Sequence, residues 1–212
     1  MPRRSPVAPR ASVTFIAFLR AINVGGHTVK MDSLRAHFTR LGFAGVETVI
    51  ASGNVIFEAA RATPRELESL IAKELQGRLG YAVATFVRTS ADLEKVVRHR
   101  PFDPESFDYD AHTLYVGFLP ARPNAEVTRK IVALRSPVDE LHIQGRELYW
   151  GIRARLSESP ITGALLERSL GMPMTLRNIT TLKRIATKFA PASENMGKPG
   201  AEPSRRLSQR TS

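Results

Sequence analysis

The chain has 212 residues, of which 42% are hydrophobic and 24% are charged, and its formal net charge is +11. This length and composition are typical of a globular protein with one large domain or two small ones. The lack of cysteine excludes disulfides, thiolate catalysis and thiolate metal sites. The apolar runs are too short to cross a bilayer, so we expect a cytoplasmic protein with no membrane partner.

The positive charge lies mainly at the two ends and in the last third of the chain. Residues 1–11 and 191–212 are rich in proline, serine and arginine and have little to bury, so we predict disordered tails there. Residues 146–190 hold eight basic and three acidic side chains. This distribution fits either a nucleic-acid-binding surface or an ordinary solvated basic face.

A first unit is predicted at residues 12–88. Its hydrophobic periodicity indicates, in order, a strand at 13–20, a helix at 31–41, a hairpin at 46–59, a helix at 63–79 and a strand at 81–88. Gly42 ends the first helix, and Thr63 and Glu66 form a capping box at the start of the second. The predicted buried stripe of the second helix comprises Leu67, Leu70, Ile71, Leu75 and Leu79.

The same order of elements recurs after a connecting helix and an acidic loop at residues 89–111. The second unit, residues 112–190, reads as a strand at 112–119, a helix at 122–134, a hairpin at 138–152, a helix at 159–171, a strand at 172–177 and a last helix capped by Asn178. We therefore predict the α+β class, with two tandem ferredoxin-like (βαββαβ) units. Several strands are apolar on both faces, which indicates that each sheet is covered on its second side as well.

Polar residues gather at one edge of the first predicted sheet. In this topology the first strand lies antiparallel beside the third, so Arg20 and Asn54 should be neighbours. The glycine loop and the hairpin turn fall on the same edge. An arginine fork, amides, a hydroxyl and glycine N–H groups would suit a phosphate or another anion. The candidate ligand-binding residues are Arg20, Asn23, Gly25, Gly26, Ser52, Gly53 and Asn54.

A structural role for the same residues is the alternative. The string lacks the Gly-Lys-Ser/Thr of a P-loop and the G-x-G-x-x-G spacing of a dinucleotide fold. Gly25 and Gly26 could serve only the turn, and Asn23 and Asn54 could brace loop backbone groups. The sequence leaves both alternatives open.

A second basic cluster is predicted in the last third, where Arg177, Asn178 and Lys183 come together at the end of a strand and the start of a helix. An asparagine at a helix N-terminus beside basic side chains suits an anion. Its alternative is an ordinary helix cap with surface charges.

Other chemistries find little support in the sequence. The five histidines are scattered without metal-ligand spacing, and the acidic loop lacks the EF-hand pattern, so we predict no metal and no cofactor. No recognisable catalytic constellation is present, including a G-x-S-x-G elbow. Phe15, Phe18 and Phe57 occupy strands on which RNA-recognition modules stack bases, but core packing explains them better.

Three stretches resemble domain-of-unknown-function family 1697, a group of bacterial proteins. They are "FLRAINVGGHTVKMDSLRAHFTRLGF", "ASGNVIFE" and "TLRNITTLKRIA", and the similarity covers about residues 13–189. The chain departs from the family's pattern at Ala21, where glycine is common, and at Ile179, where tryptophan is common. The resemblance implies a tandem ferredoxin-like fold and no established activity.

The sequence as a whole predicts an uncharacterised protein that binds a phosphate-bearing or other anionic small ligand. The predicted site is the edge formed by the glycine loop and the first hairpin. The alternative is a nucleic-acid-binding module that uses the basic last third and the tails.

Overall fold

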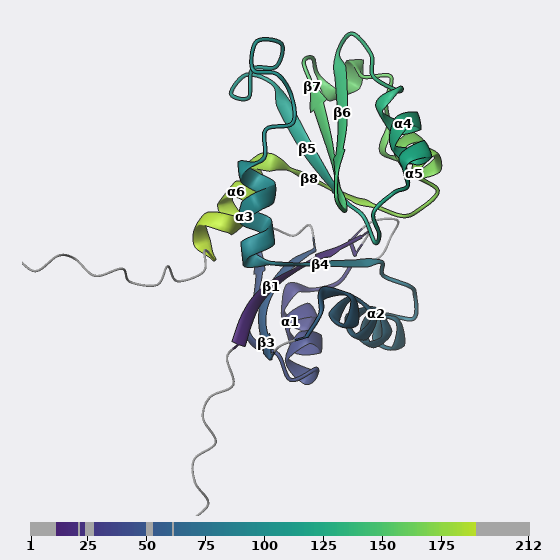
Figure 1. Cartoon of the computed structure of the whole chain (residues 1–212). Helices are drawn as coiled ribbons and strands as arrows, with labels where there is room; N and C mark the ends of the chain where they lie inside the picture. The colour runs from purple at the N-terminus through teal and green to yellow at the C-terminus, as the bar shows by residue number, and fades with distance from the viewer. Residues whose placement is uncertain (1–11, 21, 24–27, 50–52, 61, 190–212) are drawn as a thin grey trace, which may run out of the picture.

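The structure, a computed structural model, describes residues 12–20, 22–23, 28–49, 53–60 and 62–189. The tails predicted at 1–11 and 191–212 lie outside the described residues. The chain forms a mixed α+β fold with two four-stranded antiparallel sheets, one above the other in Figure 1. No helix in the described ranges combines the length and apolar character needed to cross a membrane.

The first half of the molecule contains β1 (Ser12–Leu19), α1 (Met31–Arg40), β2 (Ala44–Val49), β3 (Asn54–Ala60), α2 (Pro64–Leu79) and β4 (Thr85–Thr89). Its sheet has the order β2-β3-β1-β4. The predicted antiparallel pairing of the first and third strands is confirmed, because Phe18 pairs with Asn54. Helices α1 and α2 cover one face of this sheet through Leu34, Phe38 and Ile71.

The second half repeats this arrangement with β5 (Thr113–Phe118), α4 (Ala125–Val132), β6 (Asp139–Gln144), β7 (Glu147–Ile152), a short 3-10 turn (Leu156–Glu158), α5 (Gly163–Leu170) and β8 (Thr175–Asn178). The sheet order is β6-β7-β5-β8, which is the order of the first sheet. Helices α4 and α5 cover the outer face of this sheet and bury Trp150 and Leu148.

The inner faces of the two sheets meet in a central core. Alternation along β1 sends Phe15, Ala17 and Leu19 towards α1 and α2, and it sends Ile16 and Phe18 towards the second sheet. Phe18 stacks on Phe118 of β5, with ring centroids 4.0 Å apart and 7° between the ring planes. The expectation that the second face of each sheet is covered is therefore confirmed.

Two further helices complete the central core. Helix α3 (Ser90–Arg98) follows β4 directly, and α6 (Ile179–Lys188) follows β8 directly. They lie side by side next to the two sheets and contribute Leu93 and Leu182 to the same cluster. The sequence predicted α3 only as a connecting helix. In the structure α3 packs on the sheet of the first half as α6 packs on the sheet of the second half.

The helix ends follow the local signals in the sequence. The capping box at α2 is confirmed, because the Thr63 hydroxyl accepts from the Glu66 N–H and the Glu66 carboxylate accepts from the Thr63 N–H. The prediction that Leu70 is buried is wrong: this residue is 44% exposed. The buried stripe of α2 runs through Leu67, Ile71 and Leu75, and Leu70 lies at its edge and faces solvent.

Candidate functional site

The predicted edge of the first sheet, called the rim from here on, lies where β1 ends at Leu19 and β3 begins at Asn54. The Leu19 N–H donates to the carbonyl oxygen of Gly53 at 2.8 Å. Gly53 has φ of 75°, and a Cβ there would lie 2.7 Å from a methyl group of Ile22. Only glycine fits this tight turn, because a side chain would be both strained and in collision. Gly53 therefore has a structural role that brings Arg20 and Asn54 to one edge.

The two predicted clusters meet at this rim. The Arg177 Nε donates to the Asn54 Oδ1 at 2.6 Å, and its Nη2 donates to the Leu19 carbonyl at 2.9 Å. Asn54 is fully buried and also donates to the carbonyl of Val49 at 3.0 Å. Burial lowers the pKa of Arg177 to about 10, which leaves the guanidinium charged at neutral pH. Residues 123 positions apart thus share one hydrogen-bonded group.

Arg20 lies at the open side of the same rim and reaches across to α5. Its Nε and Nη2 donate to the two carboxylate oxygens of Glu167 at 2.9 and 2.8 Å. The Arg20 side chain is 43% exposed. Glu167 also accepts from the backbone N–H of Met174 at 2.8 Å. A carboxylate from the second half therefore occupies the arginine fork of the first half.

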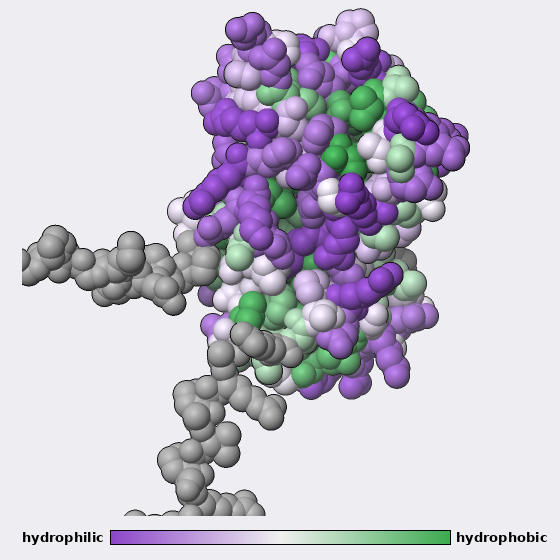
Figure 2. Space-filling model, in the orientation of Figure 1, coloured by the Kyte–Doolittle hydropathy of each residue, from purple (hydrophilic) through white to green (hydrophobic). Residues whose placement is uncertain are grey.

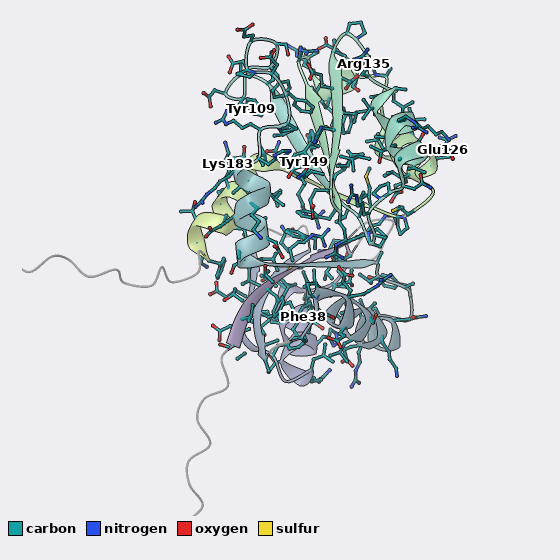
Figure 3. The ribbon with its side chains drawn as sticks, in the orientation of Figure 1. Phe38, Tyr109, Glu126, Arg135, Tyr149 and Lys183 are labelled. Atoms are coloured by element: carbon teal, nitrogen blue, oxygen red, sulfur yellow. The ribbon has the colours of Figure 1, made fainter. Side chains whose placement is uncertain are left out.

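The other predicted residues have more local surroundings. The Asn23 Oδ1 accepts from the Val29 N–H at 2.7 Å, as short polar side chains do in turns. Asn178 caps α6, because its side chain accepts from the Thr180 N–H at 2.8 Å. Lys183 projects from the exposed side of α6 (Figure 3). Gly25, Gly26 and Ser52 lie outside the described residues.

A second arginine, which the sequence analysis did not single out, repeats the role of Arg177. Arg88 of β4 is only 2% exposed, and its Nη2 donates to the carbonyls of Leu119 and Arg146 at 3.2 and 3.1 Å. Its Nε donates to Glu147 at 2.6 Å. The acceptors occupy corresponding places in the two sheets. Leu19 is the last residue of β1, and Leu119 directly follows β5. Asn54 is the first residue of β3, and Glu147 is the first residue of β7.

Each half of the molecule therefore sends an arginine from its last strand to the rim of the other half. A signal for this exists in the sequence: Arg88 and Arg177 each stand one residue before a helix-capping residue, Thr89 or Asn178. The equivalence of Arg88 and Arg177 is clear only in the structure, where α3 and α6 occupy corresponding places in the two halves.

Further charges surround Arg88. Glu68 of α2 accepts from the Val87 N–H at 2.8 Å and from Arg146 at 3.2 Å, and it lies 3.5 Å from the Arg88 Nη1. Burial lowers the pKa of Arg88, and the charge of Glu147 opposes that shift. The two acids and two arginines balance one another in the interior.

One serine, histidine and glutamate group lies elsewhere, on α1 and α2. The Ser33 Oγ is 3.5 Å from the His37 Nε2, and the His37 Nδ1 is 3.7 Å from Glu74. These separations exceed the about 2.6–3.2 Å at which a base takes a proton from a nucleophile. We assign no catalytic role to this group. Within the described ranges, no cluster of three or more potential ligands could hold a metal ion.

The fold and the rim define an α+β protein in which two antiparallel sheets face each other. An arginine from each half donates hydrogen bonds to the other half. The chain belongs to the family described as Protein of unknown function (DUF1697), which matches residues 13–149. This match includes the first two of the three resembling stretches, whereas the third, at 175–186, lies beyond it.

Among solved structures, the chain is similar to the conserved bacterial protein SP0830 from Streptococcus pneumoniae. The TM-score is 0.65 and the identity is 24%, over 84% of this chain and 98% of that chain. At this identity the similarity shows a shared fold alone. No curated protein matches the chain. Any assignment of function therefore depends on the site itself.

Proposed function

We propose that this protein binds a phosphate-bearing or other anionic small molecule at the rim around Arg20, and that its two halves are ferredoxin-like units. The observation that carries the proposal is the bidentate pair of Arg20 with Glu167 at an exposed position. A fork that holds a carboxylate with two parallel N–H groups has the right geometry for two phosphate oxygens. In this proposal Glu167 occupies the anion position until a ligand replaces it.

The surroundings of Arg20 support an anion at this place. Arg177 stands behind the rim and is charged, and it donates to the Asn54 amide oxygen, the Thr175 hydroxyl and the Leu19 carbonyl. Glu167 is the acidic partner of Arg20, so displacing it would leave the positive charge of Arg20 facing the ligand. Asn54 and Arg177 are part of the proposed site as a rigid wall that orients Arg20.

The remaining proposed residues adjoin this wall. Asn23 and Gly53 fix the two turns, and Asn178 and Lys183 extend the basic edge towards α6. Gly25, Gly26 and Ser52 are adjacent in sequence to these turns, and their backbone N–H groups are proposed to contact the ligand.

The test uses two variants that should act in opposite directions. Glu167→Gln removes the competing charge while its amide oxygen can still accept from Met174, so it should tighten anion binding. Arg20→Ala removes the fork and should weaken binding about tenfold or more. Binding is measured by calorimetry and thermal shift with inorganic phosphate, nucleotides and sugar phosphates at constant ionic strength.

The matched controls are Glu94→Gln and Arg98→Ala, which break an exposed ion pair on α3. Neither should change the affinity. The proposal fails if none of these anions stabilises the protein, or if both rim variants bind as the unaltered chain does.

Nucleic-acid binding is the alternative, and the exposed neighbours Lys183 and Arg184 on α6 favour it. Polyanion binding would weaken steeply as salt rises, with a slope that counts the neutralised phosphates. It would also depend on Lys183 and Arg184 rather than on Arg20. A small ligand at the rim would depend on Arg20 and respond much less to salt. A salt titration of the unaltered chain and of Arg20→Ala therefore separates the two functions.

A further inference from the structure

A pocket of about 400 Å³ lies against the outer face of the second sheet, where α5 begins. Tyr115 of β5 and Trp150 of β7 line it from the sheet. Leu156 and Thr162 line it from the segment before α5, and Gly163 is the first residue of that helix. None of the described residues that line the pocket belongs to the rim. The volume suits a small molecule.

The corresponding place in the first half is filled by the protein itself. Phe15 pairs with Phe57 across β1 and β3, and Tyr115 pairs with Trp150 across β5 and β7. Phe57 and Trp150 are both the fourth residue of their strands, so the two pairs occupy equivalent positions. Phe15 and Phe57 are 1% and 0% exposed, in one cluster with Leu67 from the first turn of α2. Tyr115, in contrast, is partly exposed.

The length of α5 explains this difference. Helix α2 has 16 residues and α5 has 8, and both end at a left-handed glycine, Gly80 or Gly171, shortly before the last strand of their sheet. Helix α5 therefore lacks about two turns at its start. The segment 153–162 takes the place of these turns and covers Tyr115 only in part. The pocket lies where the missing turns would pack on the sheet.

Leu156 stands at the border of this pocket. The surface in Figure 2 is mostly hydrophilic, and among the described residues only Leu70 and Leu156 are large hydrophobic side chains that are exposed. A single exposed leucine is common on protein surfaces. Leu156, however, is 51% exposed beside an apolar hollow, so a ligand in the pocket would bury it together with Tyr115.

The lining indicates the chemistry of the ligand. None of the described residues that line the pocket is charged, so an ionic ligand would lose hydration without gaining a counter-charge. The indole N–H of Trp150 already donates to Asp139 at 2.8 Å. The Tyr115 ring packs against the Trp150 ring, with centroids 5.7 Å apart, and it is the more accessible of the two. Aromatic side chains interact favourably with further rings in stacked or edge-on geometry.

We propose that this pocket is a second ligand site, independent of the rim, and that it binds a neutral aromatic molecule of about one or two rings. The ligand ring packs on Tyr115, and Leu156 covers it from the side of the solvent. The apolar lining selects against charge, so this site and the anion-binding rim take ligands of opposite character.

The test uses three small probes that differ in one property each. Phenol is neutral and aromatic, cyclohexanol is neutral and aliphatic, and benzoate is aromatic and charged. Binding is measured by NMR titration through the indole N–H resonance of Trp150, which is the chain's one tryptophan and lines the pocket.

Two variants change the pocket in different ways. Gly163→Leu should fill it without disturbing the fold, because a Cβ at Gly163 would lie 3.6 Å from Leu176, in ordinary contact. Gly77→Leu is the matched control, since Gly77 lies in α2 with nothing within 4 Å of its Cβ position. Leu156→Ser removes the cover at an exposed position, so this variant should fold as the unaltered chain does.

We expect saturable binding of phenol, about threefold or more tighter than that of cyclohexanol or benzoate. Gly163→Leu should weaken phenol binding about tenfold or more and Leu156→Ser about threefold, whereas Gly77→Leu and Arg20→Ala should leave it unchanged. The proposal is overturned if phenol does not shift the Trp150 resonance, if cyclohexanol or benzoate binds as tightly as phenol, or if both pocket variants bind as the unaltered chain does. A second copy of the chain is the other possible occupant, and a dimer in sedimentation that Leu156→Ser dissociates would also overturn the proposal.

Discussion

Arg88 and Arg177 show how single charged side chains join the two halves of this protein. Each comes from an edge strand of one sheet and donates to a backbone carbonyl at the end of the first strand of the other sheet. Burying a guanidinium costs desolvation free energy, and several hydrogen bonds per arginine are needed to offset it. The carbonyls of Leu19 and Leu119 meet this need because strand ends leave backbone oxygens without a ladder partner.

At this scale we predict that Arg88→Met destabilises the protein by about 3–5 kcal/mol. Methionine keeps much of the apolar stem but leaves Glu147 buried without its charged partner. The free energy of unfolding is measured by urea titration. Arg98→Met is the control: Arg98 is exposed and pairs only with Glu94 on the same helix, so its loss should cost less than about 0.5 kcal/mol. Equal effects of the two substitutions would contradict this account of Arg88.

At the scale of the elements, α2 to α6 each begin where a short polar side chain accepts a backbone N–H. Thr63, Thr89, Asn124, Thr162 and Asn178 all cap helices in this way. Helix α1 differs, because Lys30 precedes it and makes no side-chain cap. Its start is held instead by packing of Leu34 and Phe38 on the first sheet.

We predict that Thr63→Ala destabilises the protein by about 1 kcal/mol, because it removes the acceptor for the Glu66 N–H. Ser69→Ala in the same helix is the control. That hydroxyl only donates to the Arg65 carbonyl at an exposed position, so its removal should be neutral or slightly stabilising. Thermal unfolding of both variants measures the difference, and a cap variant as stable as the control would refute the prediction.

The capping box also predicts a pH dependence. Hydrogen bonds from the Thr63 backbone and side chain lower the pKa of Glu66 below its ordinary 4.5. A lowered pKa in the folded state means that the contribution is present above the unfolded value and is lost as pH falls through the folded one. The difference in stability between Glu66→Gln and the unaltered chain should therefore shrink on acidification below pH 4.5.

At the scale of the whole molecule, the two sheets share one central core. Phe18 and Phe118 stack at its centre, and α3 and α6 pack beside them. Neither half could expose its inner sheet face to water without losing this burial, which is worth about 25 cal/mol per Å² of apolar surface. The halves should therefore unfold together.

Trp150, the chain's one tryptophan, allows a direct test. Phe57→Ala removes a buried ring from the outer core of the first half and should cost about 3–5 kcal/mol. The fluorescence of Trp150, which lies in the second half, should then report a lower urea midpoint that coincides with the far-UV circular dichroism transition. Leu70→Ala, at an exposed site on α2, should leave the midpoint almost unchanged. An unshifted fluorescence transition in Phe57→Ala would mean that the halves unfold separately.

How much could be predicted from the sequence depends on the range of the interactions. The capping box at Thr63, the hairpin at 138–152 and the pairing of β1 with β3 were all predicted, because they follow from neighbours a few residues apart and from the strand order. The exposure of Leu70 was not predicted, since a wide apolar stripe does not show which of its edges faces solvent.

By itself the sequence determined the alternation of strands and helices and the need to cover each sheet on both faces. It also placed Arg20 beside the turn that precedes Asn54. Only the tertiary structure decided that Glu167 fills the Arg20 fork, that Arg177 reaches Asn54, and that Tyr115 and Trp150 share a pocket. These contacts join residues tens to more than a hundred positions apart, and they depend on how two sheets with similar local patterns dock against each other.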